Sequence, residues 1–182
     1  VVDWVLVELR NKLNSAQVLA TRSALLERDG DVIGTDGNAR ILFNVSADNY
    51  FVAVRHRNHL GVMTANTVTL NANEVGVDLT RGAIGTWGAS AQAVLSDQRS
   101  GLWAGNAMRD DALRYLGNQN DRDPILLFIG GSVPTNTAVG YRPEDVNMDG
   151  TVKYVGQGND RDFILQNVGG AVPTTVRFQQ LP

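Results

Sequence analysis

Apolar residues alternate with polar ones through residues 1–80, and this period of two is the pattern of antiparallel β-strands. Turn signals separate the alternating segments, and Asp29-Gly30 and Asp36-Gly37 are both typical of hairpins. The pattern predicts strands over residues 1–9, 17–28, 39–45, 49–58, 66–70 and 75–79. Strands at this spacing, with polar turns between them, predict an antiparallel β-sandwich.

The opening segment is apolar on both of its faces. Val5, Val7 and Leu9 point to one side, whereas Trp4 and Leu6 point to the other. Such a strand is either central in a sheet or covered by another part of the chain. Because it lies at a chain end, it could alternatively add to the sheet of a neighbouring molecule.

The last third of the chain contains an internal repeat with an offset of 39 residues. Residues 113–126 match residues 152–165 at most positions, and the register continues without a gap. Further along, Gly130-Gly131 corresponds to Gly169-Gly170. The sequence therefore predicts a duplicated structural unit over residues 101–182, behind a β domain over residues 1–100.

The second copy opens with the pattern D-x-N-x-D-G-x-V, which is typical of a calcium-binding loop. Oxygen-bearing side chains take positions 1, 3 and 5, a glycine turns the chain at position 6, and position 7 offers its backbone carbonyl. These residues are Asp145, Asn147, Asp149, Gly150 and Thr151. A solvated turn rich in Asp and Asn is the competing interpretation of the same letters.

The end of this loop is less regular than its start. Residues 153–158 are interpreted as an insertion after position 8, which moves Asn159 to position 9 and Asp162 to position 12. Asp160 competes with Asp162 for the role of terminal ligand. A short helix is predicted from Phe163 to Val168 and is ended by Gly169-Gly170. For Asp160 and its counterpart Asp121, helix capping is the alternative role.

The first copy departs from the loop pattern. Position 1 has lost its charge, position 3 has lost its oxygen, and position 6 is not glycine; the residues at positions 1, 3, 5 and 6 are Asn106, Met108, Asp110 and Asp111. Asn120, Asp121 and Asp123 remain at the later positions. Fewer anionic ligands weaken calcium binding. We therefore expect one bound Ca²⁺ in the second copy and a weaker, reshaped or empty site in the first.

The second copy resembles the dockerin-type repeat of secreted bacterial proteins. Its segment K-Y-x-G-x-x-N-D-R-D-x-I-L is similar to a dockerin-like C-terminal region common in secreted Bacteroidetes proteins, and the resemblance covers about residues 103–182. It implies a mainly β protein with a small α part, in which an immunoglobulin-like or jelly-roll-like sandwich precedes a pair of calcium loop-helix repeats. It also implies an extracellular or cell-surface location.

Composition removes several function classes. The net charge is −3 with acidic groups spread along the chain, which is unlike a nucleic-acid-binding protein. The absence of cysteine excludes disulfides, thiolate zinc sites and a cysteine nucleophile. No apolar run approaches the length of a membrane span. The histidines His56 and His59 are too few for a catalytic zinc site, and no G-x-S-x-G elbow occurs, so we expect no enzyme activity.

Two functions fit these observations. The first is a non-enzymatic structural or adhesive module that self-associates, as a homo-oligomer or as the repeating subunit of a surface filament assembled by strand addition. The second is a binding module for carbohydrate, or for a cohesin-like protein partner in a secreted enzyme complex. Trp4, Trp87 and Trp103 are candidates for a sugar-stacking platform, although core packing is the simpler role for each of them.

Overall fold

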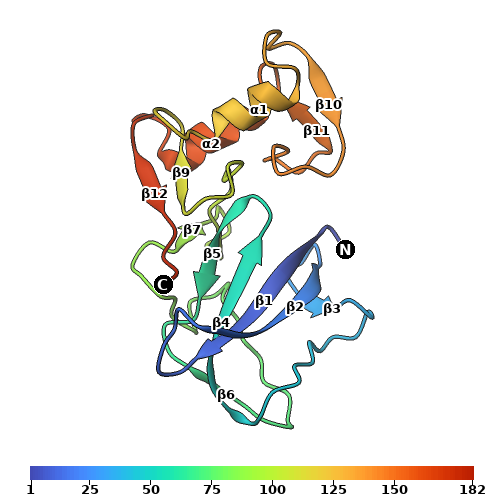
Figure 1. The fold of residues 1–182 in the computed structure, drawn as a ribbon, viewed down its shortest axis with the longest axis vertical. Coiled ribbons are helices and arrows are strands. Elements are labelled where there is room, and N and C mark those ends of the chain that lie inside the picture. Colours follow the sequence, from blue (N-terminus) through green and yellow to red (C-terminus); the bar gives the residue numbers. More distant parts are fainter. The chain divides into compact units, whose positions relative to one another are not determined.

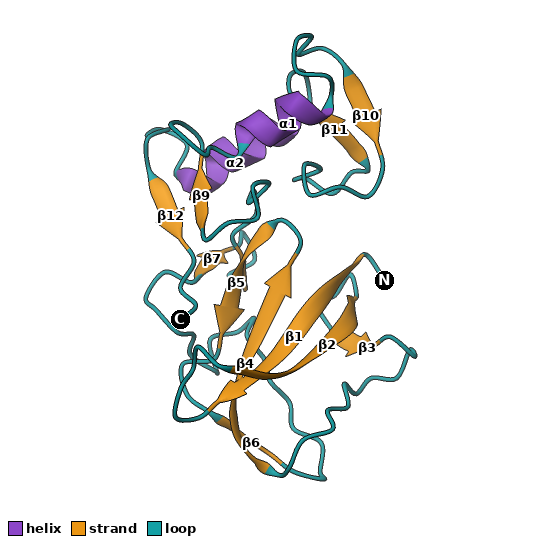
Figure 2. Ribbon diagram, viewed as in Figure 1, coloured by secondary structure: helices purple, strands orange, loops and turns teal.

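The computed structural model describes all residues, Val1–Pro182, and contains twelve strands and two helices (Figures 1 and 2). It is mainly β with antiparallel sheets, which confirms the predicted class. The chain forms two compact units. The first comprises Val1–His56, Gly61–Leu102 and Gln180–Pro182, and the second, called here the repeat unit, comprises Arg57–Leu60 and Trp103–Gln179.

A six-stranded sheet forms the centre of the first unit. Its strands run in the order β3-β2-β1-β4-β5, with β6 paired to β4. Their bounds are β1 (Asp3–Asn11), β2 (Val18–Leu26), β3 (Val32–Gly34), β4 (Asp48–His56), β5 (His59–Met63) and β6 (Val68–Leu70). Strand β1 is hydrogen-bonded to β2 along one edge and to β4 along the other, so the two apolar faces of the opening segment belong to a central strand.

One face of this sheet carries the core of the first unit. Its buried residues are Val5, Val7, Leu9, Ala24, Tyr50 and Val52. Ile41 and Phe43 pack against them, whereas Leu42 between them is 75% exposed. The strand predicted over residues 39–45 is wrong, because these residues form no ladder. Their alternation comes instead from an extended segment that covers the sheet on one side. The strand predicted over residues 75–79 is absent for a similar reason, since Val77 packs on the same core.

The opposite face of the sheet contains buried charges. Glu8 lies 2.7 Å from Arg10 and 3.0 Å from Arg55, and Arg10 also donates to the carbonyl oxygens of Ser15 and Pro182. The other strands of this unit, β7 (Gln92–Val94) and β8 (Ser100–Leu102), form a separate ribbon. One sheet with a small ribbon does not establish two packed sheets, so the sandwich stays a prediction.

The repeat unit contains two copies of a strand–helix–strand element. The first repeat has β9 (Ala112–Arg114), α1 (Arg122–Phe128) and β10 (Thr137–Val139), and the second has β11 (Thr151–Lys153), α2 (Asp160–Val168) and β12 (Val176–Phe178). Each strand of the first repeat lies 39 residues before its counterpart. The predicted helix is confirmed, and it begins three residues earlier than predicted, at Asp160. Gly169 ends it with a φ of 123°, as a glycine at this position can.

The two repeats exchange strands with each other (Figure 1). Strand β9 of the first repeat pairs with β12 of the second, and β11 of the second pairs with β10 of the first. The registers are equivalent, since Leu113 faces Arg177 and Val152 faces Ala138. The unit therefore has an internal two-fold relation, and neither repeat completes a strand pair from its own residues.

The core of the repeat unit follows the same relation. Leu113, Ile125, Ile129 and Ala107 of the first repeat occupy the positions of Val152, Ile164, Val168 and Val146 of the second. All eight side chains are buried, together with Leu60. Equivalent residues from both repeats thus meet in one core, which explains why the apolar positions of the repeat coincide.

Candidate metal centre

Asp145 at position 1 anchors the loop of the second repeat. Its Oδ1 accepts a hydrogen bond from the backbone N–H of Asp149 (3.1 Å) and its Oδ2 accepts one from Gly150 (3.0 Å). The carboxylate is buried. Met148 and Gly150 have φ values of 59° and 86°, and this left-handed backbone winds the chain around the Asp145 side chain.

Asn147 and Asp149 continue the same winding. The side-chain oxygen of Asn147 accepts from the N–H of Asp149 (2.9 Å), and Oδ1 of Asp149 accepts from the N–H of Thr151 (2.8 Å). The amide of Asn147 donates to the carbonyl of Gly158 (2.7 Å), which brings the predicted insertion back against the loop. The side chains at positions 1, 3 and 5 therefore each bond to the backbone of the same turn.

Asp160, the first residue of α2, reaches back to the start of the loop. Its Oδ1 accepts from the N–H groups of Val146 (2.7 Å) and Asn147 (3.2 Å), and its Oδ2 accepts from the N–H of Lys153 (2.8 Å). The residue is fully buried. One carboxylate thus joins the start of the loop, strand β11 and the start of the helix.

Asp162 has a different position. The N–H of Asp162 donates to the side-chain oxygen of Asn159 (3.0 Å), and the Asn159 amide donates to the Asp162 carboxylate (2.8 Å) and to the carbonyl of Gly156 (2.7 Å). This reciprocal pair caps the N-terminus of α2. The Asp162 side chain is 49% exposed and pairs with Arg161. Of the two competing carboxylates, Asp160 is the one that contacts the loop, and capping is the role of Asn159 and Asp162.

The loop concentrates negative charge where water is partly excluded. Burial raises the pKa of Asp160 to about 6, although three backbone N–H donors act in the opposite direction. Burial also raises the pKa of Asp145, and the neighbouring Asp149 carboxylate contributes to that increase. Two cations partly balance this charge: Arg57 lies 4.0 Å from Asp145, and Lys153 lies 3.6 Å from Asp149.

The donor set has the chemistry that Ca²⁺ requires, because it consists of carboxylate, amide and carbonyl oxygens. Asp145, Asn147, Asp149 and Asp160 would supply the side-chain oxygens, and Thr151 would supply a carbonyl. The acidic side chains do not converge on a single point, since no group of three or more acidic or histidine residues is arranged to hold an ion. The residues therefore fit calcium in type and in sequence position, and a coordinated ion requires the side chains to turn inward.

The first repeat has the same framework. Asp121 accepts from the N–H groups of Met108 (3.0 Å) and Arg114 (2.7 Å), as its counterpart does in the second repeat. Asn120 accepts from the N–H of Asp123 (3.2 Å) and donates to its carboxylate (2.8 Å), which repeats the cap of the second helix. Asp121 makes no side-chain cap bond, so its alternative role as a helix cap is not observed.

The first loop closes without a charged residue at position 1. The Asn106 oxygen accepts from the N–H of Asp110 (3.1 Å), and the Asn106 amide donates to the carbonyl of the same residue (2.6 Å). The carboxylate of Asp110 forms an ion pair with Arg114 at 2.9 Å. Asp111 has no positive φ, unlike Gly150 at the same position. At position 1, the Asn106 amide therefore donates to a peptide carbonyl, whereas the second oxygen of Asp145 accepts from a peptide N–H. Arg114 lies beside Asp110, the carboxylate at position 5.

This difference makes the two loops respond unequally to substitution at position 6. Gly150→Ala is expected to lower the free energy of unfolding by about 1 kcal/mol, because alanine in left-handed backbone is strained. No atom lies within 4 Å of the added Cβ, so steric contact adds nothing. Asp111→Ala is expected to change it by less than about 0.5 kcal/mol. Urea denaturation of both variants tests the pair, and equal losses would contradict it.

Asp121 predicts a pH dependence of stability. Burial raises its pKa to about 7 from an ordinary value of 3.8. The protonated form therefore favours folding, and this contribution is complete below the ordinary pKa and is lost as the pH rises through 7. In chelator, we expect the free energy of unfolding of Asp121→Asn to rise relative to that of the wild type by roughly 1 kcal/mol per pH unit between pH 5 and 7. Urea denaturation across this range measures the gap, and a constant difference would refute the prediction.

The histidine and tryptophan candidates His56, Trp87 and Trp103 each contact a neighbouring side chain. Nε2 of His56 lies 3.0 Å from Oδ2 of Asp3, and both side chains are buried beside the core of the first unit. Trp87 packs edge-on against Phe51 with ring centroids 5.6 Å apart. The guanidinium of Arg177 lies 3.7 Å from the ring centroid of Trp103. Trp103 packs against the core of the repeat unit, whereas Trp87 and Trp4 are 37% and 39% exposed, so core packing is observed for Trp103 alone.

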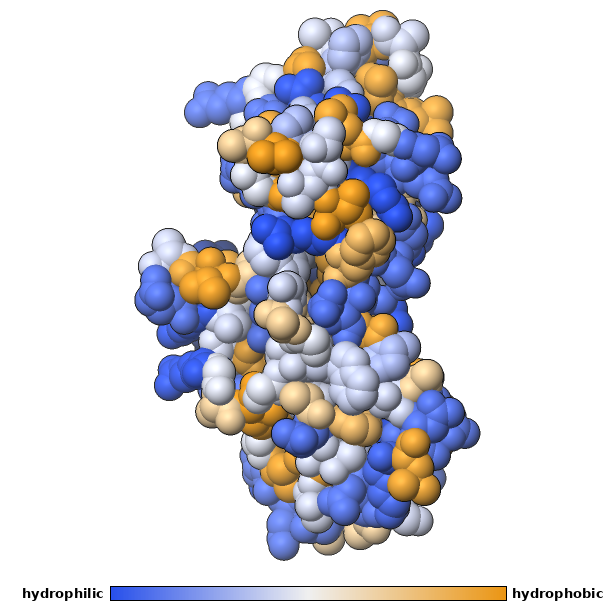
Figure 3. Space-filling model, turned by 90° about the vertical axis from the view of Figure 1, so that its left-hand side faces the viewer, coloured by the Kyte–Doolittle hydropathy of each residue, from blue (hydrophilic) through white to orange (hydrophobic).

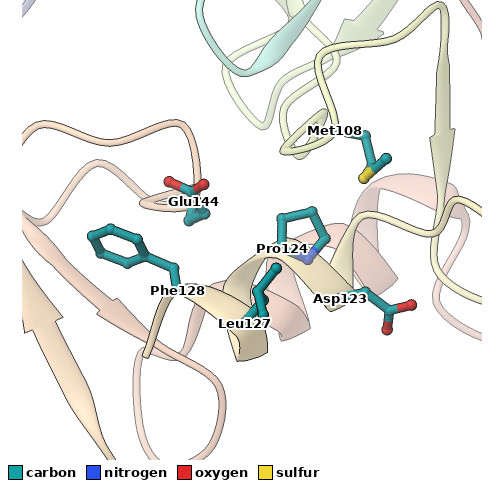
Figure 4. A pocket seen from close by; sticks show the side chains of 6 residues that line it. All are labelled: Met108, Asp123, Pro124, Leu127, Phe128 and Glu144. Carbon is teal, nitrogen blue, oxygen red and sulfur yellow. The ribbon is translucent and has the colours of Figure 1, made fainter. Parts of the chain in front are cut away.

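An apolar pocket on the surface of the repeat unit is shown in Figure 4. Met108, Pro124, Leu127 and Phe128 line it, with the carboxylates of Asp123 and Glu144 near its margin. On the face drawn in Figure 3, apolar side chains form small groups between polar ones.

Neither of the two helices has the length and apolar composition that crossing a membrane requires. Comparison with protein-family models, with curated proteins and with solved structures finds no match for this chain.

Proposed function

We propose that the chain is a non-enzymatic extracellular structural or adhesive module in which one Ca²⁺ stabilises the loop of the second repeat. The observation that supports this most strongly is the position of Asp160. It binds the backbone of Val146 and Asn147, so the first and last carboxylates of the loop meet at the same short stretch of chain. The other oxygen donors of the pattern lie between them.

Asp145, Asn147, Asp149 and Asp160 would hold the ion, with the carbonyl of Thr151. Bound calcium would supply two positive charges to carboxylates whose pKa values are already raised by burial. The loop side chains would orient the donors, because each is held by backbone N–H groups of the same turn. Because the chain has no cysteine, this ion would supply a cross-link of the kind that disulfides supply in other secreted proteins.

Self-association into a filament or homo-oligomer belongs to the same proposal. Strand β1 has a partner on each side and is therefore not available for strand addition, whereas β2 lies near the β3 end of the sheet, where its first part has no second partner strand. Only Ala24, Leu25 and Leu26 of β2 are paired to β3, while Val18 and Leu19 earlier in the strand are 43% and 46% exposed. An unpaired edge with exposed apolar side chains is suited to adding a strand from another molecule.

Calcium titration tests the metal role. Saturating Ca²⁺ is expected to raise the melting temperature over that in chelator, because an ion that binds only the folded form stabilises it by about 2.7 kcal/mol at a hundredfold excess over Kd. Asp149→Ala is expected to remove most of this response. The matched variant Asp110→Ala, at the same position of the first repeat, is expected to retain it. Identical melting in calcium and chelator, with no ion uptake, would refute the proposal.

A further inference from the structure

A buried arginine lies beside the candidate ligand Asp145. Nη2 of Arg57 is 4.0 Å from Oδ2 of Asp145, and the two side chains are only 9% and 3% exposed. An arginine side chain is charged at all accessible pH values. At this separation and burial, solvent screens the attraction less than it does for a surface pair.

The arginine is fixed in this position by neighbours other than Asp145. One guanidinium nitrogen donates to the carbonyl of Arg142, and the guanidinium stacks over the ring of Tyr141 at 4.2 Å. The next residue, Asn58, donates to the carbonyls of Pro143 (3.1 Å) and Asp145 (2.8 Å). The turn between β4 and β5 is therefore attached to the chain just before the loop, and the charge cannot move away without breaking these contacts.

Asn58 also contacts the first repeat, where no arginine plays the equivalent role. Its carbonyl accepts from the N–H groups of Gly105 and Asn106, both at 2.9 Å. Position 1 of that repeat is the uncharged Asn106, which needs no counter-ion. The positive charge of the turn is paired with position 1 only in the repeat where that position is an anion.

We propose that Arg57 is a built-in counter-cation that competes with the divalent ion for Asp145. This inference rests on the proposed calcium site and concerns its regulation. With no calcium bound, Arg57 offsets the charge of Asp145 and holds the loop together. When calcium binds, the arginine stands beside a doubly charged ion and lowers its affinity. A site of this kind suits calcium at extracellular levels, where modules bind with Kd values of roughly 10⁻⁴–10⁻³ M.

Calcium titration of Arg57→Gln, by calorimetry at fixed ionic strength, tests the competition. Removal of the charge is expected to lower the Kd by about tenfold, because repulsion of the bound ion is lost. The same variant is expected to melt at a lower temperature than the wild type in chelator. Arg57→Lys keeps the charge and is expected to retain a Kd near that of the wild type. Arg114→Gln, which removes a positive charge beside the first loop, is the matched control and is expected to bind as the wild type does.

Tyr141→Leu supplies a second route if Arg57→Gln fails to fold. Tyr141 is 55% exposed, so its loss leaves the core intact and releases the arginine from its stacked position. The Kd of Tyr141→Leu for calcium is expected to decrease by a smaller factor than that of Arg57→Gln. Unchanged or weaker binding in both Arg57→Gln and Tyr141→Leu overturns the competition while leaving the calcium site in place. No calcium uptake by the wild type overturns the calcium site itself, and the competition with it.

Discussion

Asp160→Ala is expected to destabilise the repeat unit by an amount comparable with the loss of a core side chain. The change removes the acceptor of three backbone N–H groups, those of Val146, Asn147 and Lys153. A buried donor left without a partner costs about 1–3 kcal/mol, so the total loss is expected to reach at least about 2 kcal/mol even if water reaches one of the three. Urea denaturation in chelator measures this loss without any contribution from an ion.

Asp162→Ala is the matched control for that measurement. It lies two residues away and also carries a carboxylate, but its side chain accepts from the Asn159 amide at the helix cap and from the neighbouring Arg161, and from no backbone N–H of the loop. Loss of a cap contact costs about 1 kcal/mol. A loss as large as that of Asp160→Ala would show that the cap, rather than the loop closure, holds the repeat together. In the presence of calcium, the same two variants distinguish a residue that binds the ion from a residue that caps the helix, because only Asp160→Ala is expected to abolish ion uptake.

Ile164→Ala is expected to destabilise the repeat unit by about 2–5 kcal/mol, because it leaves a cavity in a core where the side chain is fully buried. Ile125→Ala, at the equivalent position of the first repeat, is expected to cost a similar amount, since the two residues share one core. The measurement is urea denaturation in chelator.

Leu127→Ala is the control for these two variants. Its side chain is 76% exposed, and its replacement is expected to change the free energy of unfolding by less than about 0.5 kcal/mol. If only one of the two isoleucine variants were strongly destabilised, the idea of a common core would fail.

Sequence reasoning located the local features of the repeat unit. The helical turns over Phe163–Val168 and the helix end at Gly169 follow from apolar spacing and from a glycine stop, both of which are encoded within a few residues, whereas the start at Asp160 was not predicted. The positions of Asp145 and Asp149 follow from the loop letters for the same reason. The exchange of strands was not predictable, because β10 and β12 have three residues each, too few for a period to show.

The choice between Asp160 and Asp162 also needed the structure. The insertion over residues 153–158 hides the spacing on which position numbers depend, and the partners of Asp160 lie up to 14 residues away. The pairing of Arg57 with Asp145 also needed the structure, since nothing in the sequence near either residue connects the two. Strand β5 was missed for a similar reason: its residues lie between the strands predicted over 49–58 and 66–70, and their burial depends on distant neighbours.

Because each repeat receives a strand from the other, the two halves are expected to melt as one cooperative unit. Amide protons of β9, which bond to β12 of the half with the proposed calcium site, should then exchange with solvent at rates that depend on calcium, although β9 belongs to the half with the altered loop. An ion bound by the second repeat would in this way make the first repeat more rigid, although no residue of the first repeat binds it. That sharing explains how a degenerate loop persists in a folded pair: a change that abolishes binding in one half is tolerated while its partner still contributes the strand that completes it.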